Sequence, residues 1–309
     1  MVSYFLWPKQ NISFLFHSFL LWRKKENLEK EFENLYSSGY PILCSSGRSA
    51  IKMVLKLREC ERKDNIKIFP YASKCVIDAI SSISNPSVHD DINNKVKIVY
   101  NQWGFINNEV CENRTIIEDS VDTLLLPNNS VFSLKSDFAI WSLPKIYGTS
   151  SGAVLWCSDY ADKEKLIQIR EKSKPSIMLW FIRILGNFSS FFNKIWSGFA
   201  PELPNITRFE VSEIFFALTK LDEIIEDRKS KINLLSDLLP ENILIPENIL
   251  PTVLPIYSFK TDTELKKLGI ESGNRHFVNS KKIIKVIPLP IHQDVQKKWV
   301  LKTRKVLLG

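Results

Sequence analysis

The chain has 309 residues, of which 44% are hydrophobic and 25% are charged, so a fibrous or disordered chain is excluded. Its net charge is +8. Because the lysines and arginines are spread along the chain without a long basic block, we expect no nucleic-acid partner. Five cysteines, an odd number without a Cys-x-x-Cys pair, disfavour a disulfide framework or zinc site and favour a reducing cytosol. They are Cys44, Cys60, Cys75, Cys111 and Cys157.

Two segments, Ile12–Trp22 and Ile177–Phe199, are rich in aromatic and aliphatic residues. The first is shorter than the roughly 20 residues that a spanning helix needs and lacks the small-residue cleavage site of a signal peptide. Polar residues interrupt the second: Arg183, Asn187, Asn193 and Lys194. We expect neither segment to span a membrane. Packing at a subunit interface and shallow contact with a membrane surface both remain open.

Strand-like and helix-like stretches alternate from residue 40 onward. The predicted strands are Tyr40–Cys44, Ile66–Phe69, Val96–Tyr100, Thr115–Glu118, Phe138–Trp141 and Ala153–Cys157. Helical spacing of apolar residues from Ala50 to Leu57 predicts a helix after the first strand, and Cys75–Ile80 is predicted as another. Such alternation is typical of an α/β domain with a mainly parallel sheet.

The pattern changes near residue 207. Thr207-x-x-Glu210 is a capping-box sequence, and apolar residues recur at helical spacing from Val211 to Ile225. This spacing predicts one long helix that ends near Arg228. Prolines at 240, 246, 251 and 255 then indicate short strands and turns. We therefore predict a large domain over residues 1–206 and a smaller C-terminal α/β domain over residues 207–309, opened by the long helix.

The segment Ser46-Gly47-Arg48-Ser49-Ala50 lies between a predicted strand and a predicted helix. The N-terminus of a helix presents unpaired N–H groups and partial positive charge, which suit a phosphate. Ser49 could add a hydroxyl and Arg48 a guanidinium. An ordinary turn capped by Ser45 or Ser46 explains the same residues.

Two later strand ends carry charged side chains. Asp119 follows Ile116-Ile117-Glu118 at the edge where ligands gather, and a carboxylate facing a pyridine nitrogen makes the ring an electron sink. Lys145 follows the next strand, where a lysine is uncommon unless it is paired or reactive. Ser142, three residues earlier, could reach a phosphate. The alternatives are a capping or surface-paired aspartate and a lysine in solvent.

A phosphate turn, then an acid, then a lysine is the order found in pyridoxal-phosphate (PLP) enzymes. From about Leu28 to the C-terminus the sequence resembles the DegT/DnrJ/StrS-type sugar aminotransferases, a branch of fold type I. The resemblance implies a large domain with a mainly parallel central sheet and a smaller C-terminal α/β domain. The matching segments are 46–50, Phe69-Pro70-Tyr71, Ile117-Glu118-Asp119, 136–142 with Lys145, Ser151-Gly152, 213–228 and 287–292.

The resemblance also assigns roles. It implies that Lys145 carries pyridoxal 5'-phosphate and moves the reacting proton, that Asp119 pairs with the pyridinium, and that Tyr71 stacks on the ring. The phosphate is assigned to Gly47, Arg48, Ser49 and Ser142. Asp122 stands near the phenolic oxygen, where the family usually has Gln or His.

Other positions depart from the family pattern. The interval from Ser142 to Lys145 is short, Tyr71 lies one residue closer to Pro70 than usual, and the glycine-rich stretch is reduced to Ser150-Ser151-Gly152. A family asparagine that reaches the neighbouring subunit's phosphate aligns with Arg208, or with Asn205 after a shift. These departures affect substrate choice and activity more than PLP binding.

The resemblance implies transfer of an amino group from an amino acid, expected to be glutamate, to a nucleotide-linked keto-sugar for surface polysaccharide or amino-sugar biosynthesis. It also implies a cytoplasmic homodimer in which both subunits complete each site. Two alternatives are a PLP-fold homologue without turnover, serving in regulation or binding, and a PLP-dependent sugar dehydratase. Lys145 disfavours the dehydratase, because those relatives replace the lysine with histidine.

Overall fold

The computed structural model describes residues 4–20, 22–89, 94–107, 114–186, 188–198, 205–241, 243–257, 260–279 and 282–308. Cys111 and Asn187 therefore lie outside the described residues, and the segment 177–199 is described up to residue 198.

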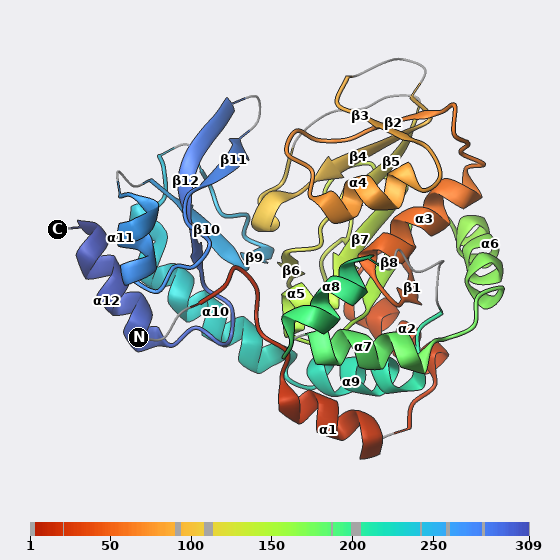
Figure 1. The fold of residues 1–309 in the computed structure, drawn as a ribbon, viewed down its shortest axis with the longest axis horizontal. Helices are drawn as coiled ribbons and strands as arrows, with labels where there is room; N and C mark the ends of the chain where they lie inside the picture. Colours follow the sequence, from red (N-terminus) through yellow and green to blue (C-terminus); the bar gives the residue numbers. More distant parts are fainter. Residues whose placement is uncertain are drawn as a thin grey trace.

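A seven-stranded sheet forms the centre of the larger body, with strand order β1-β8-β7-β5-β4-β2-β3 (Figure 1). Its strands are β1 (Tyr40–Cys44), β2 (Asn65–Lys67), β3 (Asn85–Ser87), β4 (Val96–Tyr100), β5 (Thr115–Asp119), β7 (Phe138–Ser142) and β8 (Ala153–Cys157). Within this sheet β8 runs antiparallel to both β1 and β7, and the pairs from β7 to β3 are all parallel. The predicted α/β class with a mainly parallel sheet is confirmed.

The six predicted strands agree with the structure to within one residue at each end, except at the end of β2, and the short edge strand β3 has no predicted counterpart. β2 ends at Lys67, two residues before the predicted end at Phe69. Pro70 has no N–H to offer a strand ladder, and the Phe69 ring leaves the sheet to stack on Tyr100, with 4.6 Å between ring centroids. The sheet therefore ends early where the chain begins to build the site described below.

Hydrophobic cores cover both faces of the sheet, because alternate residues of a strand point to opposite faces. Ile140 and Leu155 pack with α3 (Gly47–Leu57), α4 (Lys74–Ser81) and α6 (Tyr160–Glu171). Trp141 and Trp156 pack on the other face with α2 (Lys25–Leu35), α5 (Leu143–Tyr147) and α9 (Arg208–Leu218).

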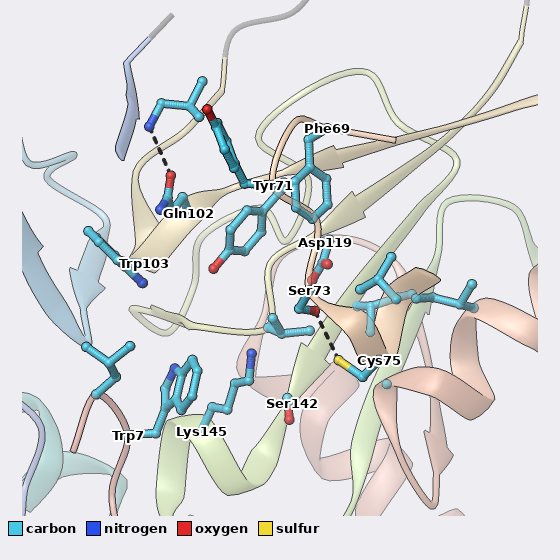
Figure 2. Close-up of a pocket in the computed structure, with 18 of the residues that line it drawn as sticks. Trp7, Phe69, Tyr71, Ser73, Cys75, Gln102, Trp103, Asp119, Ser142 and Lys145 are labelled. Carbon is cyan, nitrogen blue, oxygen red and sulfur yellow. Dashed lines mark hydrogen bonds between the residues drawn. The ribbon is translucent and has the colours of Figure 1, made fainter. Parts of the chain in front are cut away.

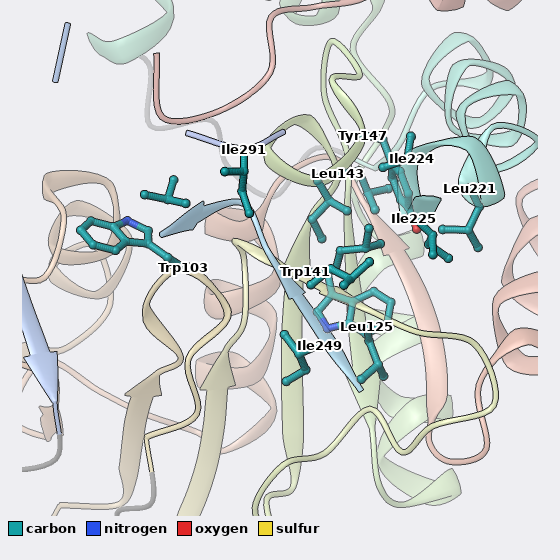
Figure 3. Packing of buried hydrophobic residues seen from close by; sticks show 14 of the residues in the cluster. Trp103, Leu125, Trp141, Leu143, Tyr147, Leu221, Ile224, Ile225, Ile249 and Ile291 are labelled. Atoms are coloured by element: carbon teal, nitrogen blue, oxygen red, sulfur yellow. The ribbon is translucent and has the colours of Figure 1, made fainter. Parts of the chain in front are cut away.

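The C-terminal part holds a three-stranded antiparallel sheet of order β10-β12-β11. Its elements are β10 (Val253–Ile256), β11 (Arg275–Asn279), β12 (Lys282–Pro290), α10 (Leu221–Leu235), η2 (Ser236–Leu238), α11 (Asp262–Lys267) and α12 (Lys297–Leu308). A further pair joins the two parts: β6 (Thr123–Leu125) runs antiparallel to β9 (Ile249–Pro251). Figure 3 shows the shared core, in which Trp141 of the large sheet and Ile249 of β9 belong to one cluster.

Two helices stand where the sequence predicts one long helix. The capping box is present, since the Thr207 hydroxyl accepts from the Glu210 N–H at 3.3 Å and Glu210 accepts from the Thr207 N–H at 2.6 Å. However, α9 ends at Leu218, where the Thr219 hydroxyl donates to the Phe216 carbonyl, and α10 begins at Leu221. The two helices then pack differently: α9 on α1 (Ile12–Leu20), and α10 on α12 and β9.

The aromatic segment after α6 forms α7 (Ile177–Gly186) and α8 (Ser190–Gly198), which pack against each other. Trp180 of α7 stacks on Phe209 of α9 with 4.8 Å between ring centroids. Among the described residues, no helix combines the length and the apolar composition needed to cross a bilayer.

Candidate active site

A cavity of about 790 Å³ opens at the carboxyl edge of the large sheet. Its walls come from the ends of β1, β5 and β7, from η1 (Gln102–Gly104), and from the β11–β12 hairpin of the C-terminal part (Figure 2). Six of the residues predicted from the sequence line it: Gly47, Arg48, Tyr71, Asp119, Ser142 and Lys145. Sequence positions almost 100 residues apart are thus brought to one site.

In the turn after β1, a serine caps α3, and the N-terminus of this helix faces the cavity. The Ser49 N–H donates to the Ser46 hydroxyl at 3.2 Å, so Ser46 caps α3. The Ser49 hydroxyl is buried and lies 3.0 Å from the hydroxyls of both Ser45 and Ser46. The cavity is lined instead by Ser46, Gly47 and Arg48, which suit an anion at this helix end. A phosphate contact from Ser49 stays a prediction.

The two acids that end β5 have different environments, because neighbouring strand residues face opposite ways. Glu118 is fully buried and accepts from the Ser133 N–H at 3.1 Å and the Leu134 N–H at 2.8 Å, so it fixes a loop. Asp119 faces the cavity, and its Oδ1 is buried without a hydrogen-bond partner among the described residues. An acceptor left in this state calls for a donor from a bound group.

Burial raises the pKa of Asp119 to about 7, an effect that Lys145 partly offsets and Asp122 reinforces. A protonated pyridine nitrogen placed at Oδ1 would supply both the missing donor and a positive charge. The residues present therefore fit the ring nitrogen of PLP.

Lys145 lies on the short helix α5, which follows β7 directly. Its Nζ is 3.0 Å from Asp122 Oδ1 and 4.4 Å from the centroid of the Trp7 ring. The helix has Pro144 in its first turn and ends at Gly148 in the left-handed region, at φ +79°. Arg228 of α10 is fully buried and donates to the Ile146 carbonyl at 2.5 Å, where a cation suits a helix end.

Asp122 contacts side chains from three separate parts of the chain: Trp7, Tyr100 and Lys145. It is fully buried and accepts from the Trp7 indole N–H at 2.9 Å and from the Tyr100 hydroxyl. Burial, the largest effect, lowers the pKa of Lys145, but Asp122 and Asp119 together outweigh it and hold that pKa above its ordinary value. Lys145 is thus held as a cation between two carboxylates.

Trp7 is a site residue that the sequence did not reveal. The N-terminal segment reaches the site along the C-terminal part, where the Tyr4 N–H donates to the Gly269 carbonyl at 2.8 Å and the Lys9 N–H to Asp294 at 2.7 Å. A tryptophan ahead of the first predicted helix carries no local signal for such a place, because the contacts that hold it lie more than 250 residues away in the chain.

Tyr71 lies on the outer wall of the cavity. It has φ +61° and is 66% exposed, and its ring is parallel to that of His276 in β11, with 5.0 Å between centroids. Phe69 is the aromatic residue of this turn that packs inward, on Tyr100. Stacking of Tyr71 on the cofactor stays a prediction.

Arg183 brings the aromatic segment to the site, since this α7 residue lines the cavity. Its pKa is lowered to about 10, mainly by burial, a shift that Glu210 opposes and the charge of Arg48 reinforces. Two guanidinium groups therefore influence each other near the N-terminus of α3, an arrangement that suits a phosphate.

Neither candidate for the family asparagine, Asn205 or Arg208, lines this chain's own cavity, and a contact with the neighbouring subunit's phosphate stays a prediction. Asn205 is buried and donates to Glu171 at 3.1 Å, and Arg208 lies 4.5 Å from the Trp22 ring. The shortened loop is held by α9 instead, as Glu213 accepts from the Ser150 N–H at 2.6 Å and Glu210 from the Ser151 hydroxyl at 2.5 Å.

No curated protein sequence matches the chain, but a family model described as "Putative PLP-dependent aminotransferase" matches residues 28–298. Among solved structures, the chain is similar to PseC of Helicobacter pylori, an aminotransferase involved in the biosynthesis of pseudoaminic acid (TM-score 0.68, 11% identity, covering 100% of this chain and 98% of that one). It is also similar to the aminotransferase TlmJ of Streptoalloteichus hindustanus (TM-score 0.67, 13% identity, covering 100% of this chain and 97% of that one).

A third similar structure is DesI, solved in the presence of its TDP-sugar product (TM-score 0.66, 9% identity, covering 99% of this chain and 92% of that one). These identities are low, so the likeness establishes the fold, which is PLP fold type I. Its neighbours in structure are sugar aminotransferases of the DegT/DnrJ/EryC1/StrS type. Because the family model spans most of the chain, the protein belongs to the PLP-dependent aminotransferases.

Proposed function

We propose that the protein transfers an amino group from an amino acid, with glutamate as the expected donor, to a keto-sugar carried on a nucleotide. The observation that carries this proposal is the convergence of Lys145, Asp119 and the N-terminus of α3 on one cavity. The TDP-sugar product of DesI and the sugar pathway of PseC support the substrate class. We further propose a cytoplasmic homodimer that serves surface polysaccharide or amino-sugar biosynthesis.

Four groups of this chain would hold PLP. Lys145 would carry it, Asp119 would face the ring nitrogen, and the N-terminus of α3 with Ser142 would take the phosphate. When bound, PLP supplies an electron sink that allows an amino acid to lose its α-proton. Asp119 would keep a proton at the ring nitrogen, because its buried Oδ1 has no competing donor among the described residues.

Lys145 would handle the reacting proton. Its amine must be neutral to accept that proton or to attack a carbonyl carbon, whereas the pair with Asp122 at 3.0 Å favours the cation. Asp122 therefore favours the charged form of Lys145 at rest. The Trp7 indole donates to the same oxygen of Asp122, so the N-terminal segment contributes to this balance.

The size and charge of the cavity support a substrate larger than an amino acid. Its volume of about 790 Å³ lies in the upper range of small-molecule sites. Arg275 and His276 of β11 line the cavity together with Arg48 of α3. The guanidinium groups of Arg48 and Arg275 suit the diphosphate of a nucleotide-linked sugar.

Absorption spectroscopy tests this proposal. The purified protein with PLP is expected to show a cofactor band that Lys145→Ala lacks, and glutamate should shift that band before a nucleotide keto-sugar restores it. Mass spectrometry would then identify the amino-sugar product. A Lys145-dependent band that no amino donor shifts would instead indicate a PLP-fold protein without turnover. A deoxygenated sugar product without amine transfer would indicate the dehydratase.

A further inference from the structure

A second cavity, of about 190 Å³, lies where the two parts of the chain join. Its walls come from residues 130–133, from the residues that follow β4 and β5, and from the β6–β9 pair. Figure 3 shows three of its lining residues, Leu125 of β6, Trp141 of β7 and Ile249 of β9, in the core that both parts share. Among the described residues, none lines both this cavity and the larger one. The second cavity is therefore a separate site, which the proposed transamination does not use.

Polar and apolar side chains line the second cavity in equal number. The apolar half consists of aliphatic and aromatic residues that include Phe132 and Trp141. The polar half carries hydroxyl or amide groups, which can both donate and accept hydrogen bonds. These residues are Asn101, Ser120, Thr123, Ser130, Ser133 and Asn248. None of the described lining residues is charged. Apolar walls with a few placed polar groups are typical of small-molecule sites.

Thr123 presents an unsatisfied hydroxyl on the wall of this cavity. Its side chain lies on the same face of β6 as that of Leu125, because alternate residues of a strand point the same way, and both residues line the cavity. Thr123 is only 4% exposed, and its Oγ1 has no hydrogen-bond partner among the described residues. Such a buried hydroxyl costs free energy unless it is paired. We therefore expect a hydrogen-bonding group of a ligand beside it.

Glu118, which stands behind the polar wall, indicates the charge of that ligand. The Asn101 amide donates to Glu118 Oε2 at 3.1 Å, and the Ser133 hydroxyl donates to the same oxygen. A buried carboxylate disfavours an anion nearby, and one that already has several donors does not need a cation. The Asn101 amide also donates to the Ser120 hydroxyl at 2.8 Å, so Ser120 keeps its own proton to donate. A neutral ligand with hydroxyl groups matches this wall.

The segment 119–123 separates the second cavity from the cofactor site. Asp119 and Val121 line the larger cavity, whereas Ser120 and Thr123 line the second one. Between them, Asp122 pairs with Lys145 at 3.0 Å. A ligand in the second cavity would thus contact the same short segment that positions the two carboxylates of the cofactor site.

We propose that the second cavity binds a small neutral polyhydroxylated molecule, no larger than one monosaccharide. Its hydroxyl groups would pair with Thr123, Ser120 and Asn248, and its C–H groups would lie against the Trp141 ring. Water alone matches this lining less well, because it would hydrate the apolar half, whereas a polyol carries both kinds of surface. The volume sets the upper limit, since sites for drug-sized ligands measure roughly 300–1,000 Å³.

Saturation-transfer NMR on the PLP-loaded protein, without an amino donor, tests this proposal. We expect glucose to give a saturable signal that excess glycerol displaces, and acetate and methylammonium to give none. Thr123→Val keeps the shape of the side chain but removes the hydroxyl, so it should weaken glucose binding about fivefold. Ser130→Trp fills the cavity from an exposed position and should abolish binding. The matched control is Thr303→Val, which changes a buried threonine of α12 and should bind glucose as the parent does.

Four outcomes would overturn the proposal. The first is the lack of a saturable signal from either neutral probe, which would leave the cavity to water alone. The second is tighter binding of a charged probe, and the third is an equal loss of binding in Thr303→Val. The fourth is a loss in Arg275→Gln but not in Thr123→Val, which would place glucose in the larger cavity. Cooperative urea unfolding would show that each variant is folded, and Ser130→Trp keeps the test decisive if Thr123→Val is not. Because Lys145→Ala should still bind glucose, failure of the proposed catalysis would remain distinguishable from failure of this site.

Discussion

Asp119 should reduce the stability of the cofactor-free protein at neutral and alkaline pH. Its folded pKa is about 7, raised by burial from an ordinary value of 3.8. The folded state therefore keeps a proton that the unfolded state releases between these values, so stability falls as the pH rises through that window. At about 1.36 kcal/mol for each pH unit, the total loss is about 4 kcal/mol. Asp119→Asn removes the titration and should remove this loss.

Urea unfolding of the cofactor-free protein at pH 5 and pH 8 measures this effect. The free energy of unfolding of Asp119→Asn, relative to the parent, should grow by about 3 kcal/mol between the two pH values. The growth is the readout, because any cost of burying the amide is the same at both pH values. Glu247→Gln, which removes an exposed carboxylate before β9, serves as the control. A relative stability that stays constant or shrinks toward pH 8 would refute the reasoning.

Three further predictions concern the surroundings of the site. Trp7→Phe removes the indole donor to buried Asp122 and should lower the free energy of unfolding by about 1.5–3 kcal/mol in urea; an unchanged value would show that water replaces the indole. Burial lowers the pKa of His292 to about 3, so unfolding takes up a proton below about pH 6.5 and stability falls as the pH falls. The free energy of unfolding of His292→Gln, relative to the parent, should therefore rise by about 2.5 kcal/mol between pH 6.5 and 4.5. Free energies of unfolding that change in parallel with pH in the variant and the parent would contradict this. Gly152→Ala should lower stability by about 1–3 kcal/mol, since Gly152 has φ +101° and a Cβ there would lie 2.7 Å from Ile214. Gly47→Ala, with its nearest neighbours at 3.7 Å, should match the parent in the same urea titration.

The strands could be predicted because they are buried on both faces and thus appear as short, continuous apolar runs. Tyr40–Cys44, Val96–Tyr100 and Ala153–Cys157 have the predicted bounds. The break between α9 and α10 could not be predicted from the sequence, because the helical spacing of apolar residues continues through it. It depends on a threonine hydroxyl that bonds to the preceding turn and on the different surfaces against which the two helices pack.

The candidate site was predictable in part for a similar reason. Residues at the carboxyl ends of parallel strands share one edge of the sheet, so Gly47, Asp119 and Ser142 could be placed together from their order alone. Trp7 and Arg183 could not be placed there from the sequence. They reach the cavity from the N-terminal segment and from α7, whose paths depend on contacts with distant parts of the chain. Their positions follow from tertiary packing, which local patterns do not encode.

The most direct test of PLP chemistry at Lys145 is to trap the cofactor. The protein would be incubated with PLP and reduced with borohydride, and its peptides would be mapped by mass spectrometry. We predict a pyridoxyl group on Lys145 and no label at this position in Lys145→Ala. A label on another lysine of the parent protein, or none, would contradict the assignment of Lys145 as the cofactor-bearing residue.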